Sequence, residues 1–439
     1  MSRSRIVTGV FVTVLVLVVL GLAASRYLVQ SGVVSPLAAE PAPVSSDDEV
    51  APHPSLLHGR VTAVAGTVHE GRIRWGGDEE AFWSDVFNGT KAGNTWTGKL
   101  PSGVVPSEER PVSVLGFELA RRERPLDLGR PFVARFGDLA KVEPAGSIVH
   151  VTLRSGTVVA LDRHEASDFD DGVRIWSDGN GVVDLAPDDI RFVELVASPT
   201  GGAAPSRLHG TVTTSVGDFA GFFQWNRWER FGHDLLDGRS VDGAWHHLRF
   251  DTLRSLERHD DGLRVTMLDG RELVLSDHPD VGSGNRGVRL DDPRTGRVLI
   301  PWGLFERVDF SSGSSGPTRD DYPPGRALSG RVTTGDGRVL AGRLVYDLDE
   351  SETTDTLDAP SRGVSHAIAF GRIASVVPSA GEVDGVPVAS VVLRNGEELR
   401  LEHAGDLSAK NAGLLVFIEG QEQAEYLRWA DVKRIDLDG

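Results

Sequence analysis

Short stretches in which hydrophobic and polar residues alternate follow one another along most of the chain. Two of them, "VTLRSGTVVAL" (151–161) and "VTMLDGRELVL" (265–275), alternate on both sides of a Ser-Gly or Asp-Gly pair. A period of two is typical of β-strands with one buried face, and glycine at the second turn position accepts the positive φ of a tight hairpin. Almost no stretch has the 3.6-residue period of an amphipathic helix. The pattern therefore predicts an all-β protein.

The N-terminus is the exception to this pattern. Residues 6–24 are hydrophobic and uncharged, and a helix of that length rises roughly 28 Å, close to the hydrocarbon thickness of a bilayer. We expect a single transmembrane signal-anchor helix, with cleavage near Ala24 as the alternative. The basic residues in 1–5 should keep the N-terminus cytoplasmic and place the rest in the periplasm or outside the cell. Residues 25–55, rich in Pro, Ser and acids, predict a disordered linker.

One sequence unit recurs three times after this linker. "LHGRVTAV" at 57, "LHGTVTTS" at 208 and "LSGRVTTG" at 328 are each followed, in the same order, by further matches. Matches at many positions in a constant order indicate internal repeats. Each unit contains roughly eight short strand patterns, which is typical of a small β-barrel or sandwich. We therefore predict three tandem homologous β-units at 56–196 (with an insertion at 90–131), 207–310 and 327–439, joined by linkers at 197–206 and 311–326.

Acidic and amide residues after the second hairpin of each unit suggest a family. Asp280 with Asn285, and Asp406 with Asn411, resemble the Asp/Asn pair of Sm-like and SH3-like small barrels, whereas Asp168 lacks the Asn. The resemblance covers about forty residues per unit and implies a barrel fold. It does not imply nucleic-acid binding. The net charge is −18, and no basic cluster follows the first five residues, whereas phosphate recognition needs clustered Lys and Arg.

An aromatic residue followed by two acids five positions apart marks the middle of each unit. Aromatic rings can stack on sugars, and acidic oxygens can bind calcium. Alternatively, the ring closes the hydrophobic core and the second acid folds onto backbone N–H groups to fix a turn. The candidate ligand-binding residues are Trp75, Glu80, Asp85, Trp225, Glu229, Asp234, Tyr346, Glu350 and Asp355, with one inserted residue before Glu80 keeping the first unit in register.

Other chemical signals are weaker. The chain has no cysteine, which excludes thiol nucleophiles, disulfides and Cys-ligated metals. "GSGNRG" (282–287) matches a dinucleotide motif but precedes a strand pattern instead of a helix. His246 and His247 should point to opposite faces of a strand and so not share a metal. The acidic stretch 347–358 lacks the glycine of a calcium loop. We expect no cofactor, metal or catalytic residue.

These observations favour a membrane-anchored, exported, non-enzymatic β-repeat protein that acts as a binding or scaffold module in the cell envelope. Its expected partners are the membrane, through the N-terminal helix, and an envelope protein or polysaccharide. One alternative is a carbohydrate-binding or calcium-dependent adhesion module. The other is a hydrolase that uses residues outside the repeat pattern, either Trp96 in the insertion or His233 with Glu229.

Overall fold

The structure, a computed structural model, describes residues 53–76, 79–102, 104, 107–114, 117–125, 130–177, 181–199, 201, 206–313 and 316–439. The predicted cytoplasmic segment 1–5, the predicted membrane helix 6–24 and most of the predicted linker 25–55 lie outside these residues. Among the helices that the structure describes, none has the length and hydrophobicity needed to cross a membrane.

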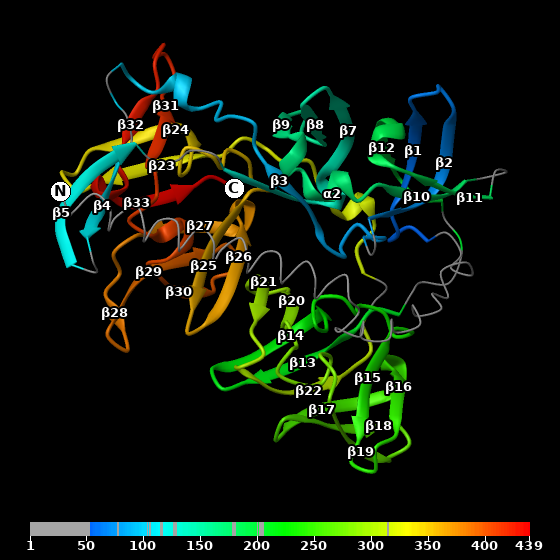
Figure 1. The fold of residues 1–439 in the computed structure, drawn as a ribbon. Helices are drawn as coiled ribbons and strands as arrows, with labels where there is room; N and C mark the ends of the chain where they lie inside the picture. Colours follow the sequence, from blue (N-terminus) through cyan, green and yellow to red (C-terminus); the bar gives the residue numbers. More distant parts are fainter. Residues whose placement is uncertain are drawn as a thin grey trace, which may run out of the picture. The chain divides into compact units, whose positions relative to one another are not determined.

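The prediction of an all-β protein is confirmed. The described residues form 33 β-strands, many short 3-10 turns and one α-helix of four residues, α2 (Ser167–Asp170). Figure 1 shows the strands following one another along the chain, with few helical turns between them.

In the first stretch (56–196) the strands are β1 (His58–Ala63), β2 (Val68–Trp75), β3 (Val86–Thr90), β4 (Ser107–Val114), β5 (Phe117–Pro125), β6 (Pro131–Arg135), β7 (Leu139–Ala145), β8 (Ile148–Leu153), β9 (Val158–Asp162), β10 (Val173–Ser177), β11 (Gly181–Leu185) and β12 (Ile190–Val196). In the second stretch (207–310) they are β13 (His209–Thr214), β14 (Gly217–Gln224), β15 (Leu235–Ser240), β16 (Trp245–Arg249), β17 (Leu253–His259), β18 (Gly262–Met267), β19 (Glu272–Ser276), β20 (Val288–Asp292), β21 (Gly296–Ile300) and β22 (Phe305–Phe310). In the third stretch (327–439) they are β23 (Ser329–Thr334), β24 (Val339–Val345), β25 (Thr356–Ser361), β26 (Val364–Ala369), β27 (Ile373–Val377), β28 (Glu382–Val383), β29 (Val386–Leu393), β30 (Glu398–Glu402), β31 (Leu414–Phe417), β32 (Glu425–Leu427) and β33 (Val432–Leu437).

The order in which strands pair is the same in the three stretches. It runs β11-β10-β2-β1-β12-β7-β8-β9 in the first, β21-β20-β14-β13-β22-β17-β18-β19 in the second and β32-β31-β24-β23-β33-β27-β29-β30 in the third. The opening strand of each stretch thus lies between the second strand and the last, and all the paired strands are antiparallel. This order does not single out an Sm-like or SH3-like barrel, and that resemblance stays a prediction.

Two kinds of glycine explain local features of the pattern. Gly156, Gly270 and Gly396 have φ near +90° at the hairpin turns, which confirms the predicted hairpins. A second set lies on strands where another backbone passes close by. A Cβ there would stand 1.9, 2.1 and 2.1 Å from backbone oxygens of the neighbouring strand at Gly71, Gly221 and Gly342.

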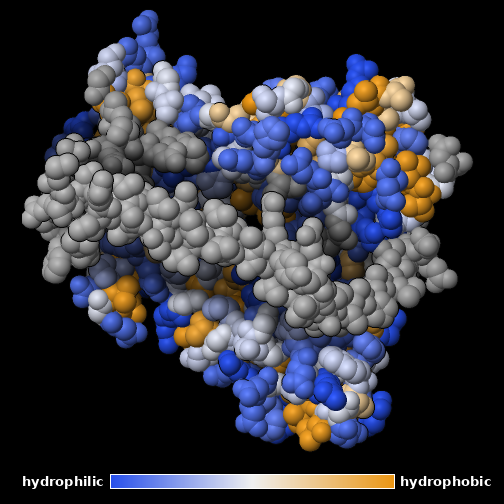
Figure 2. Space-filling view, viewed as in Figure 1, coloured by the Kyte–Doolittle hydropathy of each residue, from blue (hydrophilic) through white to orange (hydrophobic). Residues whose placement is uncertain are grey.

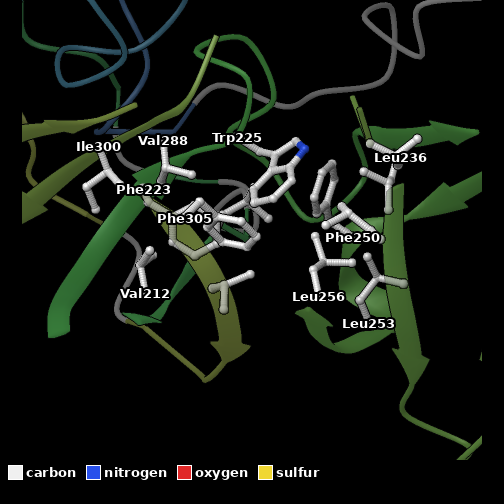
Figure 3. Packing of buried hydrophobic residues seen from close by; sticks show 14 of the residues in the cluster. Val212, Phe223, Trp225, Leu236, Phe250, Leu253, Leu256, Val288, Ile300 and Phe305 are labelled. Atoms are coloured by element: carbon white, nitrogen blue, oxygen red, sulfur yellow. The ribbon is translucent and has the colours of Figure 1, made fainter. Parts of the chain in front are cut away.

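Each of the second and third stretches has its own hydrophobic core. In the second, Trp225 meets Phe305 edge-to-face at 5.0 Å between ring centroids, and Phe250 is also buried in the same cluster. Figure 3 shows this ring among the aliphatic and aromatic side chains, with its nitrogen directed away from Phe305. Burial of such large aromatic rings contributes a major share of folding free energy. On the face drawn in Figure 2, hydrophilic residues predominate and hydrophobic ones form small separate patches.

The stretches also contact one another within the compact unit formed by residues 52–439. Strand β21 pairs with β26 across three residues, which extends the sheet of the second stretch into the third. Residues 316–326, expected to belong to a linker, pack against the first stretch. The Tyr322 ring lies over Gly137, where a Cβ would stand 2.3 Å from it, and Arg154 donates to the Tyr322 carbonyl.

Candidate ligand-binding site

The three predicted aromatic residues lie at the end of the second strand of each stretch. Trp75 and Trp225 are completely buried and Tyr346 is 2% exposed. The indole N–H of Trp75 donates to the carbonyl of Asp168 at 2.5 Å, that of Trp225 to Asp280 at 2.9 Å, and the hydroxyl of Tyr346 to Asp406 at 2.9 Å. These contacts are those expected of a ring that closes the core, and none of the three rings offers a free face to a sugar.

The structure corrects the register of the acids in the first stretch. Trp75 pairs with Glu79 in the isolated bridge that joins Trp225 to Glu229 and Tyr346 to Glu350, so Glu79 takes the position assigned to Glu80. The equivalent of Asp234 is then Ser84, and Asp85 lies one residue beyond. No residue is inserted. The run of three acids at 78–80 allowed both alignments, and only the backbone pairing separates them.

In the second and third stretches the second acid of the pair closes a turn. The Oδ2 atom of Asp234 accepts the backbone N–H groups of Arg230 and Phe231 at 2.7 and 2.8 Å. Asp355 accepts those of Ser351 and Glu352 at 2.7 and 2.9 Å. These bonds are the ones that the turn interpretation expects of a short acidic side chain.

In the second and third stretches the first acid of the pair has a buried oxygen and a raised pKa. The Oε2 atoms of Glu229 and Glu350 are buried without a hydrogen-bond partner. Burial and the charge of Asp280 raise the pKa of Glu229 to about 9. Burial and the charge of Asp406 raise the pKa of Glu350 well above its ordinary value. Burial disfavours the charged form of a carboxyl, and a nearby like charge adds to this effect.

The Asp/Asn pairs noted in the sequence have the same structural role twice. The carbonyl of Asp280 accepts from the Asn285 amide at 2.9 Å, and that of Asp406 from the Asn411 amide at 2.7 Å. Each Asn also accepts the N–H of the glycine two residues later. Asp168 has no such Asn, but its side chain accepts the backbone N–H of residue 88 at 2.6 Å. The pairs therefore fix the loop that receives the buried aromatic residue.

The non-repeated histidines are held by neighbouring side chains. His233 stacks on Phe231 at 5.1 Å between ring centroids, and its Nε2 atom lies 3.7 Å from Oδ1 of Asp234. His246 bonds Ser240 at 2.9 Å, and His247 bonds Asp237 at 2.6 Å.

The insertion contacts the acidic loop of the third stretch. Lys91 pairs with Asp349 at 2.5 Å, and Arg130 with Asp347 at 3.1 Å. The ring of Trp96, the other candidate of the hydrolase alternative, packs edge-on against Phe417 at 6.1 Å. The cations of the insertion thus neutralise two acids that the sequence offered as calcium ligands.

A cavity of about 500 Å³ lies among the three stretches. We call it the arginine cavity. Trp83 and Arg135 come from the first stretch, and residues 316–326 contribute Tyr322. Its five arginines are Arg135, Arg207, Arg289, Arg297 and Arg372. Such a volume is within the range of small-molecule sites, and guanidinium groups match carboxylate and phosphate oxygens.

The cavity holds more guanidinium groups than carboxylates that pair with them. Arg289 pairs with Asp85, and Arg135 with Asp138 at 2.6 Å. Asp291 is shared, at 2.9 Å from Arg297 and 3.5 Å from Arg207. Arg372 donates to the backbone carbonyl of Pro293 at 2.5 Å. Three carboxylates thus serve four of the five arginines, in a chain whose net charge is −18.

The remaining acids of the lining are otherwise engaged. Asp292 pairs with Arg294 at 3.2 Å, and Asp321 accepts the backbone N–H of Thr318 at 2.8 Å. Burial raises the pKa of Asp358, which disfavours its charged form. Among the described residues, neither Asp321 nor Asp358 forms an ion pair with a lining arginine, so these acids do not complete the pairing of Arg372.

Aromatic rings hold one of the arginines in place. The Arg207 guanidinium lies 3.6 Å from the centroid of the Trp83 ring and 4.0 Å from that of Phe222. Its side chain is only 3% exposed, and burial lowers its pKa to about 10, so it stays charged at neutral pH. The indole nitrogen of Trp83 is buried without a hydrogen-bond partner. An unmade bond of a buried donor is costly.

Sequence reasoning missed the arginine cavity, although one signal for it exists. On β20, Arg289 and Asp291 alternate with buried Val288 and Leu290, so their pattern predicts a solvent-facing side. In the structure, that side carries the ion pairs to Asp85 and Arg297. Oppositely charged residues at alternate positions were the signal, but nothing in the pattern shows what covers them. Comparisons with protein-family models, with curated proteins and with solved structures find no match to this chain.

Proposed function

We propose that the chain is a non-enzymatic binding protein and that its ligand is a small organic anion held in the arginine cavity. The excess of guanidinium groups over their paired carboxylates carries this proposal. A carboxylate or phosphate group would complete the pairing of Arg372. The rings of Trp83, Phe222 and Tyr322 would contact the apolar part of the same ligand.

The absence of catalysis is part of the proposal. Burial raises the pKa of Tyr322, so its phenol stays protonated and cannot act as a base near neutral pH. Burial likewise lowers the pKa of His209, and its ring bonds Ser311 at 2.9 Å. The lining side chains in the described part of the chain are thus suited to recognising charge and not to transferring a proton.

We also propose that the stretches 56–196, 207–310 and 327–439 are three repeats of one unit. Two observations support this: the identical strand order, and the aromatic-to-carbonyl bond that closes each core. The three repeats then form the arginine cavity together, because each contributes lining residues that the others lack. Anchoring by residues 6–24 and exposure to the periplasm or exterior stay proposals from the sequence, as does an envelope protein or polysaccharide partner.

The test uses thermal unfolding of the chain from residue 53 to the end with inorganic phosphate, pyrophosphate, citrate and a neutral sugar as separate probes. A ligand that binds only the folded state raises the melting temperature by mass action. We expect a shift with at least one anion and none with the sugar. Arg372→Met should abolish the shift without loss of the folded state, because this side chain has no carboxylate partner.

Arg434→Met provides the matched control. Arg434 is an exposed residue of strand β33 that pairs with Asp436 at 2.6 Å, away from the cavity lining. This variant should keep the anion shift. An equal loss in both variants, or shifts that are the same for anions and sugar, would contradict the proposal.

A further inference from the structure

A second group of polar side chains lies in the second stretch, away from the arginine cavity. Asp237 is on β15, and His278 and Asp280 are in the loop that follows β19. One donor atom from each of the three lies within 4.8 Å of the others, and the Nδ1 atom of His278 lies 3.4 Å from Oδ2 of Asp280. Two carboxylates and an imidazole at such separations are a set of first-row metal ligands.

Hydrogen bonds hold this group in a fixed geometry. The Oδ2 atom of Asp280 accepts the backbone N–H of Asp237 at 3.0 Å, and its Oδ1 atom accepts from the Asn226 amide at 3.0 Å. Asp237 in turn lies 2.6 Å from Nδ1 of His247. A metal ligand is normally oriented by such an outer partner, and a pre-arranged set lowers the entropic cost of binding.

The equivalent positions in the other two stretches show which of these residues the fold itself requires. Asp168 and Asp406 make the same bond to a backbone N–H as Asp280 does, so this Asp serves the fold in all three stretches. Two residues before it stand Ala166 and Ala404, where the second stretch has His278. Fold support accounts for Asp280, and the His278 ring has local contacts of its own: its Nδ1 atom accepts the Asp280 backbone N–H at 3.3 Å, and the ring lies edge-on to Trp245. Only the second stretch combines this imidazole with the two carboxylates.

An independent observation concerns negative charge beside the group. The Oε2 atom of Glu229 is buried without a hydrogen-bond partner, and this carboxyl interacts electrostatically with Asp280. A divalent cation bound at Asp280 would relieve this concentration of buried carboxyl groups.

We propose that Asp237, His278 and Asp280 bind one divalent transition-metal ion, for which Zn²⁺ is the natural probe. The imidazole nitrogen favours Zn²⁺ over Ca²⁺, because calcium takes six to eight oxygen ligands. With three protein ligands, a water molecule would complete a tetrahedral shell. The ion would fasten the loop after β19 to β15. This proposal does not depend on the anion site.

The test is calorimetric titration of the chain from residue 53 onward with ZnCl₂ after treatment with chelator. We expect one Zn²⁺ per chain and a rise in melting temperature, and neither with CaCl₂. Co²⁺ in place of Zn²⁺ should give the visible absorption of a low-coordinate ion. His278→Ala and Asp237→Asn should each weaken Zn²⁺ binding by at least about tenfold. Asp280 is left unchanged because the core depends on its bonds.

His246→Ala is the control, because His246 is on the neighbouring strand β16 and bonds Ser240 instead of the group. It should bind Zn²⁺ as tightly as the unmodified chain. Zn²⁺ affinity that survives His278→Ala, or that His246→Ala reduces equally, would assign the metal to surface histidines and overturn the proposal. A chain that binds no Zn²⁺ at all would overturn it as well. Circular dichroism of each variant checks that it is folded.

Discussion

Trp225 and Asp280 lie 55 residues apart in the chain and are joined by a hydrogen bond of 2.9 Å from the indole N–H to the backbone carbonyl. The equivalent bond links Tyr346 to Asp406, also at 2.9 Å. A buried aromatic ring with a polar edge needs a partner for that edge. In each stretch the partner is the loop that precedes the last strands, so the ring ties the second strand to the far end of the sheet.

The first prediction tests this bond at Tyr346. Tyr346→Phe keeps the ring and removes only the hydroxyl, leaving the Asp406 carbonyl with the Asn411 amide as its remaining side-chain donor. We expect the free energy of unfolding to fall by about 1 kcal/mol in urea denaturation. Trp228→Phe is the control, because that ring is 43% exposed and should change stability by less than about 0.5 kcal/mol. Equal effects of the two substitutions would contradict the role of the bond.

The second prediction concerns the turn closed by Asp355. Asp355→Ala leaves the buried N–H groups of Ser351 and Glu352 without their acceptor, and we expect a loss of about 2 kcal/mol or more. Ser84→Ala removes one acceptor, for the N–H of Ala81 at 3.2 Å, and should cost about 1 kcal/mol. Urea denaturation of both variants gives the comparison. A larger loss in the serine variant would show that the two turns are not equivalent.

Part of this architecture could be predicted from the sequence because it depends on local rules. Glycine after a polar residue predicted the hairpins at Gly156 and Gly270, and both have the expected positive φ. The turn interpretation of Asp234 and Asp355 needed only the chemistry of a short carboxylate beside free N–H groups. The N-terminal segment 6–24 lies outside the described residues, and its membrane role stays a prediction.

The rest depended on residues brought together from far along the chain. Glu79 and Glu80 are adjacent acids, and only the bridge to Trp75 shows which of them corresponds to Glu229. Residues 316–326 have the Gly, Pro and acidic composition of a linker, yet Tyr322 is buried against Gly137. No local pattern distinguishes an exposed arginine from one that faces a distant aspartate.

The third prediction is a loss of stability as the pH rises. Burial and the charge of Asp280 raise the pKa of Glu229 to about 9, and burial raises that of Asp406 to about 7. The folded chain then keeps protons that the unfolded chain releases above about pH 4.5. Its free energy of unfolding therefore falls as the pH rises toward these values, by up to about 1.4 kcal/mol per pH unit for each group. Urea denaturation at pH 7, 8 and 9 measures this slope.

The range from pH 7 to 9 avoids the titration of a histidine that changes stability in the opposite direction at lower pH. Burial lowers the pKa of His366 to about 4, so this group favours the folded state increasingly as the pH rises from 4 to about 6.5. Glu229→Gln is neutral at all pH values and should make the slope between pH 7 and 9 shallower, while Glu350, whose pKa is also raised well above its ordinary value, still contributes. An unchanged slope in this variant would assign the pH dependence to other groups.

The fourth prediction arises from the sharing of Asp291 between two arginines. Burial opposes ionisation of this carboxyl, but Arg297 and Arg207 lower its pKa, so it is ionised and pairs with both arginines. Arg297→Met leaves Arg207 paired, whereas Asp291→Asn leaves two guanidinium groups facing each other without a carboxylate. We therefore expect Asp291→Asn to destabilise the chain by about 3 kcal/mol, more than Arg297→Met does.

Added phosphate should reverse much of this loss in Asp291→Asn. The two released guanidinium groups form, with the rest of the arginine cavity, a site for a small anion that takes the place of the missing carboxylate. The rise in melting temperature with phosphate should be larger in Asp291→Asn than in the unmodified chain, and absent in the double variant with Arg297→Met. Chloride at the same ionic strength is the control, since general screening would act equally on all three proteins. If chloride rescues as well as phosphate, the arginines respond to screening and the cavity does not select an oxyanion.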